Sequence, residues 1–229
     1  MLRLKADLHT HTADDPRDRI GYSAEMLIDA VAQLNFDVLA IACHERVVHS
    51  RRLAEYAGRR GVLLIPGIEL LVEGKHIVVL NPDEPQTKAT TYAELRRLGR
   101  RDGLIMAPHP FYPEKSCLHK KLAEHIDLFN AVEYCCAHFP GINPNRRAVE
   151  VAQRHGLPLV GTSDTHALPY CDSTYSWLEV EEASIEGVIE AVHAGRITVV
   201  TRPRPLIEIA KMATFYVRYE AKSLAGWFQ

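Results

Sequence analysis

Histidine and acidic residues in this sequence stand at spacings that suit metal binding. Asp7, His9 and His11 are each separated by one residue, and Asp164 and His166 repeat that spacing late in the chain. Because side chains on an extended strand alternate between its two faces, residues two apart point the same way and can hold one ion together. Imidazole and carboxylate ligands in combination suit Zn²⁺, Mn²⁺ or Fe²⁺. The spacing therefore predicts metal chemistry.

Four further motifs each add a candidate ligand. They are Ala42-Cys43-His44-Glu45, Pro66-Gly67-Ile68-Glu69, His76 and Ala107-Pro108-His109-Pro110. A lone histidine is commonly a core or surface residue, so the prediction depends on the joint occurrence of these motifs. One four-coordinate ion cannot use so many ligands, which indicates two or three divalent ions, Mn, Zn or Fe. Such a cluster holds a phosphoryl oxygen between metals and lowers the pKa of a bound water, giving a hydroxide nucleophile.

The elements that must position these residues are short apolar runs alternating with amphipathic segments, a pattern typical of repeated βα units. Strands are expected over residues 2–8, 37–42, 62–68, 76–80, 103–107, 128–133, 157–161 and 197–200. Helices are expected over residues 23–34, 48–60, 92–101, 118–125, 144–155 and 184–194. Glu73-Gly74 predicts a hairpin turn. Nearly every expected strand delivers a candidate ligand to its carboxyl end, where an α/β barrel places its chemistry.

Composition restricts the class of protein. The chain has 229 residues, 47% hydrophobic and 24% charged, with a formal charge of −2. This excludes general disorder. The chain has no strong basic field, so duplex nucleic acid is not an expected partner. No apolar run reaches the roughly 18 residues of a membrane span and no signal-peptide pattern follows Met1, so a cytoplasmic location is expected. Five cysteines without a C-x-x-C pair indicate reduced, partly buried thiols.

We expect residues 1–204 to form one metal-dependent hydrolase barrel and residues 205–229 to form a helical tail. Aromatic residues at rough helical spacing in that tail predict an amphipathic helix that packs on the barrel. A homo-oligomer contact and a membrane-surface helix are the alternatives for the same face.

The ordered motif set resembles the PHP (polymerase and histidinol phosphatase) superfamily of metal-dependent phosphoesterases, over roughly residues 2–200. The resemblance implies a distorted (β/α)7 barrel, similar to a TIM barrel, with a trinuclear metal centre at its C-terminal rim. By the same resemblance, one ion would be surrounded by four residues that we expect to be catalytic: His9, His11, Glu69 and Asp164. Glu69 would bridge to a second ion held by His76 and His109. A third ion would involve His44, His166 and an early Asp.

Two departures from the family pattern concern that third ion. The family usually has Asp or Asn after the second-strand histidine, where this chain has Glu45. Its early Asp commonly follows a Ser, whereas here the loop reads Thr12-Ala13-Asp14-Asp15-Pro16-Arg17-Asp18. Asp15 is the first choice for the ligand, Asp14 the second, and Asp18 fits after a shift of the loop. Asp7 is expected to orient a ligand imidazole.

The function predicted from these residues is metal-assisted hydrolysis of a phosphate ester. The expected substrate is a nucleotide, a sugar phosphate or a short oligonucleotide. The candidate phosphate-binding residues lie in or beside expected rim loops and are His138, Arg146, Arg17 and Lys115, with Arg19 and Arg147 as further candidates. Two other classes remain as alternatives. An amidohydrolase or deaminase also uses a His-x-His strand and a late Asp, but commonly needs a lysine or a different ligand where this chain has Glu69. A metal-binding regulatory module that has lost catalysis is the other alternative.

Overall fold

The computed structural model describes residues 1–99, 102–170 and 172–205. Its centre is a nine-stranded sheet in the order β7-β6-β5-β4-β3-β2-β1-β8-β9. The strands are β1 Leu2–Thr10, β2 Val38–Ile41, β3 Leu63–Val72, β4 Lys75–Leu80, β5 Leu104–Ala107, β6 Ala131–Cys135, β7 Leu159–Thr162, β8 Thr174–Val180 and β9 Ile197–Thr201. The α-helices are α1 Ala24–Gln33, α2 Arg51–Gly58, α3 Tyr92–Leu98, α4 Lys120–Glu124, α5 Asn145–His155 and α6 Ile185–His193. Short 3₁₀ turns cover Gln86–Lys88 and Ile126–Leu128.

Strand direction brings the expected ligands to one end of the sheet. β1, β2 and β3 pair in parallel, and β5, β6 and β7 do the same. β4 is antiparallel to both β3 and β5, so the two parallel groups point in the same direction. The carboxyl ends of these strands therefore meet at one rim, and β4 presents its first residues there instead. This explains why His76 lies near the start of its strand, whereas the other candidate ligands lie in the later part of theirs or after it.

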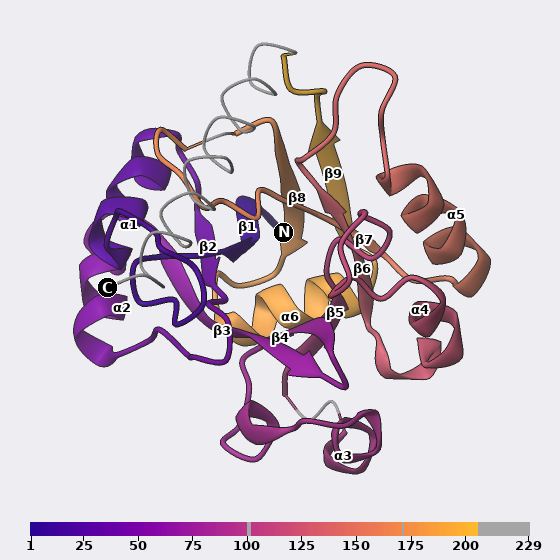
Figure 1. Cartoon of the computed structure of the whole chain (residues 1–229). Helices are drawn as coiled ribbons and strands as arrows, with labels where there is room; N and C mark the ends of the chain where they lie inside the picture. Colours follow the sequence, from indigo (N-terminus) through magenta and orange to yellow (C-terminus); the bar gives the residue numbers. More distant parts are fainter. Residues whose placement is uncertain (100–101, 171, 206–229) are drawn as a thin grey trace, which may run out of the picture.

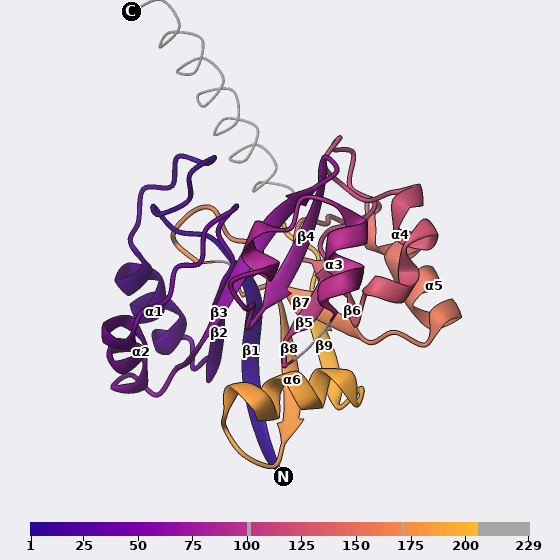
Figure 2. The same cartoon turned by 90° about the horizontal axis from the view of Figure 1, so that it is seen from below.

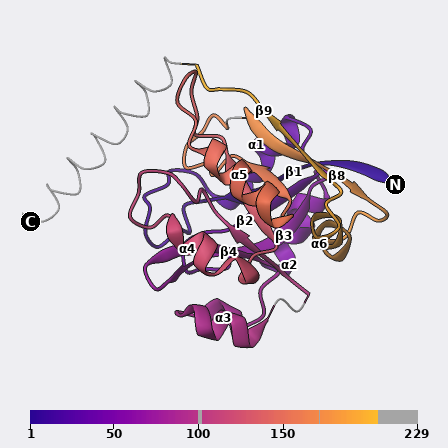
Figure 3. The ribbon, with the colours of Figure 1, turned by 90° about the vertical axis from the view of Figure 1, so that its right-hand side faces the viewer.

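The helices surround the sheet as Figures 1 and 2 show, with α1 and α2 on one side, α3 to α5 on the other, and α6 beneath the end opposite the rim. In Figure 3, α4 and α5 lie on the side that faces the viewer. Leu4, Ala6 and Leu8 of β1 point into the barrel, where they share a core with Val188 and Val192 of α6. Helix α6 therefore plugs the bottom of the barrel. No helix in the described part of the chain is long and apolar enough to cross a membrane.

The sheet is nearly closed, and a side chain completes its seam. At the rim, Thr10 and Thr165 form a parallel bridge, which joins the end of β1 to the segment after β7. Lower down, β8 occupies the free edge of β1. There the backbone N–H of Gly161 donates to Ser176 Oγ at 2.8 Å, and the Ser176 hydroxyl donates to the Gly161 carbonyl at 3.1 Å. A hydroxyl thus bridges β7 and β8 where no ladder connects them.

The sequence predicted the α/β class and most elements, but it missed β8. That strand alternates between buried and more exposed residues, with Tyr175, Trp177 and Glu179 on the outer face. Alternation of this kind is the signal that could have identified it.

A regular (β/α)7 repeat is not confirmed, because β4 and β8 run antiparallel to their neighbours and no helix separates β3 from β4. The predicted tail lies mostly in residues 206–229, outside the described residues.

Local signals account for several boundaries. Ser23 caps α1 by accepting a hydrogen bond from the Met26 N–H, as predicted. The expected hairpin turn also forms, since Glu73 and Gly74 both have positive φ, at 47° and 77°.

We expect Gly161→Ala to lower the free energy of unfolding by about 3 kcal/mol, the upper part of the usual cost of overpacking. An added Cβ would lie 2.6 Å from the Tyr175 carbonyl oxygen and 2.9 Å from Val199 Cγ1, so the seam would have to open. Gly21→Ala is the matched control, because its Cβ would meet nothing within 4 Å. Urea denaturation of both variants tests this. Equal stability of the two variants would show that the seam tolerates separation.

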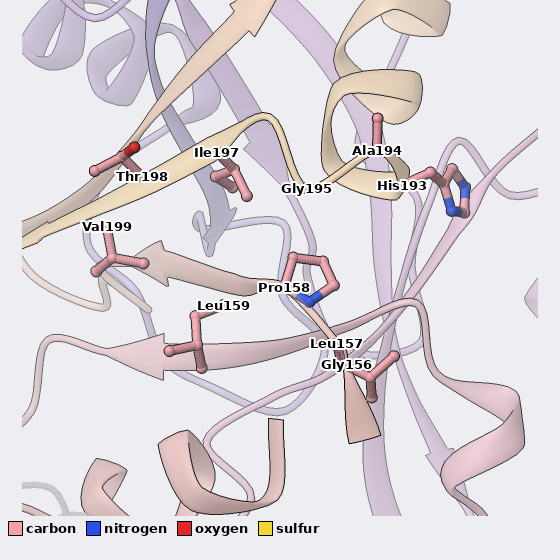
Figure 4. Close-up of a pocket in the computed structure, with 10 residues that line it drawn as sticks. All are labelled: Gly156, Leu157, Pro158, Leu159, His193, Ala194, Gly195, Ile197, Thr198 and Val199. Atoms are coloured by element: carbon pink, nitrogen blue, oxygen red, sulfur yellow. The ribbon is translucent and has the colours of Figure 1, made fainter. Parts of the chain in front are cut away.

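A hollow of about 560 Å³ lies at the opposite end of β7 from Asp164. Figure 4 shows its lining, which is mainly apolar and includes His193 and Pro158 but no carboxylate. Its position and composition separate it from the rim where the candidate ligands gather.

Candidate metal centre

Strand β1 delivers two buried imidazoles to the rim. His9 and His11 are both fully buried, and their Nε2 atoms lie 3.1 Å apart. The alternation of the strand therefore places them on one face, as the sequence predicted. Burial of two adjacent imidazole nitrogens is costly unless they bind a partner.

Glu69, at the carboxyl part of β3, lies at the centre of the cluster and is 1% exposed. Its Oε1 is 3.0 Å from His76 Nδ1 and 3.2 Å from His109 Nε2. Its Oε2 faces three other imidazoles, at 3.4 Å from His9 Nε2, 3.4 Å from His11 Nε2 and 3.2 Å from His44 Nε2. One carboxylate thus divides five imidazoles into two groups, which is the arrangement that a carboxylate bridging two ions requires.

Asp164 completes the group around His9 and His11. Its Oδ1 is 3.2 Å from His11 Nε2 and 3.7 Å from His9 Nε2. This buried oxygen has no hydrogen-bond partner within the described chain. The residue has φ of +46°, and its backbone N–H donates to the His9 carbonyl at 3.0 Å. A carboxylate oxygen left without a donor beside two imidazoles fits a cation ligand.

The remaining candidate ligands lie beside the loop after β1. Asp18 Oδ2 is 3.1 Å from His166 Nε2 and 3.6 Å from His44 Nδ1. Asp15 Oδ2 accepts from His11 Nδ1 at 2.8 Å and is 2.9 Å from His44 Nδ1. Asp14 is exposed, and its carboxylate accepts from the Thr12 hydroxyl. Among the described residues, five sets of potential ligand atoms lie within 4.8 Å of one another: His9, His11 and Asp164; His11, His44 and Glu69; Glu69, His76 and His109; Asp15, Asp18 and His44; and His11, Asp15 and Cys43.

The electrostatics of the cluster keep its carboxylates ionised. Burial alone would raise the pKa of Glu69, but the His9 charge and hydrogen bonds from His109 and His76 hold it well below its ordinary value. The same balance holds for Asp164, where the effect of burial on the pKa is outweighed by the neighbouring imidazoles of His9 and His11. Since metal ligands must be deprotonated carboxylates and neutral imidazoles, both acids are in the required form.

Glu133 of β6 is a functional residue that the sequence analysis missed. It is fully buried, and its Oε1 accepts from His9 Nδ1 at 2.7 Å and from the Thr162 hydroxyl. Its Oε2 accepts from the backbone N–H of His109. The carboxylate therefore fixes the His9 ring with Nε2 toward the cluster. Its position at the end of an expected strand, in line with the other acids, was the available signal.

The prediction that Asp7 orients a ligand imidazole is wrong. Its carboxylate accepts from the backbone N–H groups of His9 and Ser163 and from the Tyr170 hydroxyl. Burial raises the pKa of Asp7 to about 6, although the hydrogen bonds favour its ionised form. The reason is geometric. Asp7 lies two residues before His9 on β1, at the level where the backbone of the segment after β7 crosses the strand, so its carboxylate meets backbone N–H groups instead of an imidazole ring. Asp7 therefore ties that segment to β1.

The candidate phosphate-binding residues are not drawn together by the structure. His138 is buried, and its Nε2 lies 2.8 Å from Thr201 Oγ1 on β9. Arg17 pairs with Glu45 at 2.8 Å across two rim loops. Arg146 and Lys115 are exposed. Within the described part of the chain, His138, Arg146 and Lys115 have no described hydrogen bond or ion pair with a metal-ligand candidate. The role of all four residues in phosphate binding stays a prediction.

The donor set fits divalent metal ions. Mixed imidazole and carboxylate ligands suit Zn²⁺, Mn²⁺ and Fe²⁺, and the unpartnered Asp164 oxygen together with the shared Glu69 supplies positions for them. The candidate clusters therefore support the binding of divalent metal ions.

Comparisons with known proteins give a family match over part of the chain and a shared fold over most of it. Residues 143–197, which include Asp164 and His166, match the PHP-associated family model. No curated protein matches the chain. A two-domain protein from Bacteroides vulgatus containing a predicted PHP-like metal-dependent phosphoesterase is 19% identical, with a TM-score of 0.69 over 88% of this chain and 65% of that chain. PsfC from Pseudomonas syringae is 20% identical, with a TM-score of 0.69 over 96% of this chain and 99% of that chain.

A third relative is an endonuclease. The lesion-specific endonuclease EndoQ from Pyrococcus furiosus is 13% identical, with a TM-score of 0.61 over 86% of this chain and 58% of that chain. Endonuclease Q has also been solved with a 27-mer duplex substrate that has an abasic lesion at the active site. The sequence analysis predicted that duplex nucleic acid is not a partner, and these similar structures give that prediction no support. The resemblance to the PHP superfamily, predicted from the ordered motifs, is confirmed over residues 143–197 by the PHP-associated match, and the solved structures share the fold.

Proposed function

We propose that this chain is a metal-dependent phosphoesterase that hydrolyses a phosphate ester of a nucleotide, a sugar phosphate or a short oligonucleotide. The observation that carries the proposal is the sharing of the Glu69 carboxylate between two imidazole groups, with an unpartnered Asp164 oxygen beside one of them. The PHP-like relatives support hydrolysis as the reaction class.

In this proposal the first ion is held by His9, His11, Glu69 and Asp164, and the second by Glu69, His76 and His109. A third would lie among Asp18, His44 and His166. Bound divalent ions neutralise charge on phosphoryl oxygens and lower the pKa of coordinated water. The chain's own contribution is to fix these ligands. Glu133 and Asp15 hold the imidazoles of His9 and His11 in one orientation, so little reorganisation accompanies the reaction.

The test is an activity screen with defined metals. The purified chain is stripped of metal, loaded separately with Mn²⁺, Zn²⁺ or Fe²⁺, and offered p-nitrophenyl phosphate, its bis ester, nucleoside mono- and bisphosphates, histidinol phosphate and short RNA. A duplex with an abasic site is included because of the endonuclease relative, and amide and aminopurine substrates because of the amidohydrolase alternative. Metal-dependent release of phosphate or alcohol supports the proposal. Turnover of amides alone supports the alternative, and metal binding without turnover supports a regulatory module.

The early acidic ligand of the third ion can be assigned by two substitutions. Asp18 faces both His166 and His44, whereas each Asp15 oxygen already accepts at least two hydrogen bonds, including those from the Arg17 and Asp18 N–H groups. We therefore expect Asp18→Asn to remove one ion, and Asp15→Asn to weaken two ions by about 10–100-fold through His11 and His44. Metal content per chain measures both effects, with exposed Asp14→Asn as the control. Loss of one ion in Asp15→Asn and none in Asp18→Asn would make Asp15 the ligand.

A further inference from the structure

The segment between β5 and α4 contains His109 and is hydrogen-bonded to the backbone of His76, so it contacts both histidines of the second proposed ion. His109 is the second residue of this segment, and the backbone carbonyl of Ser116 accepts a hydrogen bond from the backbone N–H of His76 at 2.9 Å. The Lys75 ammonium donates to the carbonyls of Lys115 at 2.6 Å and Cys117 at 2.9 Å. The ladder between β4 and β5 extends only to Val78, so this segment takes over the edge of β4 beside His76. It therefore fixes the backbone from which one of the two imidazoles projects.

Cys117 contacts the other imidazole directly. Its Sγ lies 3.3 Å from His109 Nδ1, while His109 Nε2 lies 3.2 Å from Glu69 Oε1. The thiol is fully buried in a small cluster with Tyr112 and Cys135. Both ring nitrogens of His109 thus have a neighbour: Nδ1 faces the Cys117 sulfur, and Nε2 faces the Glu69 carboxylate.

A similar arrangement is found at the two imidazoles of the first proposed ion. His9 Nδ1 is held by Glu133 at 2.7 Å, and His11 Nδ1 is held by Asp15 at 2.8 Å. His109 differs in having a thiol in place of a carboxylate. A neutral imidazole that offers Nε2 to an ion carries its proton on Nδ1, and a partner at Nδ1 sets that tautomer and the ring orientation.

We propose that Cys117 is a positioning residue of the second ion site, where its sulfur accepts the Nδ1 proton of His109 and leaves Nε2 free for the ion. The inference rests on the proposed metal centre. Sulfur is a weak acceptor, so Cys117 orients His109 without the negative charge that Glu133 and Asp15 provide. The second ion consequently depends on a neutral contact that a hydroxyl can reproduce and a methyl group cannot.

The test compares Cys117→Ala, Cys117→Ser and the control Cys135→Ala, which removes an equally buried thiol of the same cluster that has no described contact with an imidazole. Each full-length variant is titrated with Zn²⁺ against a chelator, and its Co²⁺ form is examined by visible absorption. We expect Cys117→Ala to bind one ion about 10–100-fold more weakly and to change the Co²⁺ spectrum. Cys117→Ser should restore most of the affinity, and Cys135→Ala should bind as the parent does.

Wild-type affinity and spectrum in Cys117→Ala, or an equal loss in Cys135→Ala, would overturn the inference. A second measurement does not depend on the folding of any variant: ¹H–¹⁵N spectra of the Zn²⁺-loaded parent should show His109 with its proton on Nδ1, and a proton on Nε2 would contradict the inference. Failure of the metal centre is recognised separately. In that case the parent itself binds no ion and His109→Ala changes nothing, which would also remove the basis of this inference.

Discussion

Glu69→Gln should lower the metal content by at least one ion per chain and reduce phosphoesterase activity by about 1000-fold. The amide keeps the size of the side chain but loses the charge that five imidazoles face. An amide offers one oxygen, whereas the two Glu69 oxygens face different imidazole groups. Its NH₂ group would be turned toward imidazole nitrogens that a metal needs. Loss of a bridging ligand removes several kcal/mol of charge stabilisation, and about 4 kcal/mol corresponds to the stated decrease in rate.

Metal analysis after dialysis and initial rates with saturating Mn²⁺ measure these effects. Glu179→Gln, an exposed position on the outer face of β8, is the matched control and should resemble the parent. Unchanged metal stoichiometry in Glu69→Gln would show that Glu69 does not bridge two ions. A loss of activity with full stoichiometry would instead assign Glu69 a role after metal binding.

The positions of the metal-ligand candidates were largely predictable because strand geometry restricts them. Asp7, His9 and His11 alternate on one strand, and parallel strands bring their carboxyl ends to a common rim. Glu69, His109 and Asp164 could therefore be placed together from the sequence before any distance was known. His76 was also predictable, since the Glu73-Gly74 turn reverses the chain and returns β4 to the same rim.

Other parts of the site depend on loop geometry that no periodicity encodes. Asp15 and Asp18 are three residues apart on an irregular loop, and only the structure shows that Asp15 holds two imidazoles while Asp18 faces His166. The partner of His9 at Nδ1, Glu133, comes from a strand 124 residues further along the chain. Cys117 is only eight residues from His109, but an irregular segment brings it there, so spacing could not reveal either contact. The α/β class was predicted, but the regular (β/α)7 repeat is not confirmed, because β8 pairs antiparallel with β1 across a sequence separation that the βα pattern did not anticipate.

Substitution of Glu133 is expected to lower both the stability of the metal-free protein and its affinity for metal. Its carboxylate is a fully buried acceptor for donors from three other strands or strand ends: the His9 ring, the Thr162 hydroxyl and the His109 N–H. Glu133→Gln replaces one acceptor oxygen with an NH₂ group that must face a donor. Because an unsatisfied buried polar group costs about 1–3 kcal/mol, we expect the free energy of unfolding of the metal-free protein to fall by about 3 kcal/mol.

The same substitution should weaken metal binding at the first ion. Without the carboxylate, the Nδ1 proton of His9 loses its charged acceptor, so the ring becomes less basic and less well oriented. Outer-sphere changes of this kind lower metal affinity by about 10–100-fold. Urea denaturation in chelator and Zn²⁺ titration of the folded protein separate the two effects, with exposed Glu150→Gln on α5 as control. If Glu133→Gln loses stability but keeps its Zn²⁺ affinity, Glu133 stabilises the fold without orienting His9. The orientation of the His9 ring would then be set by its strand.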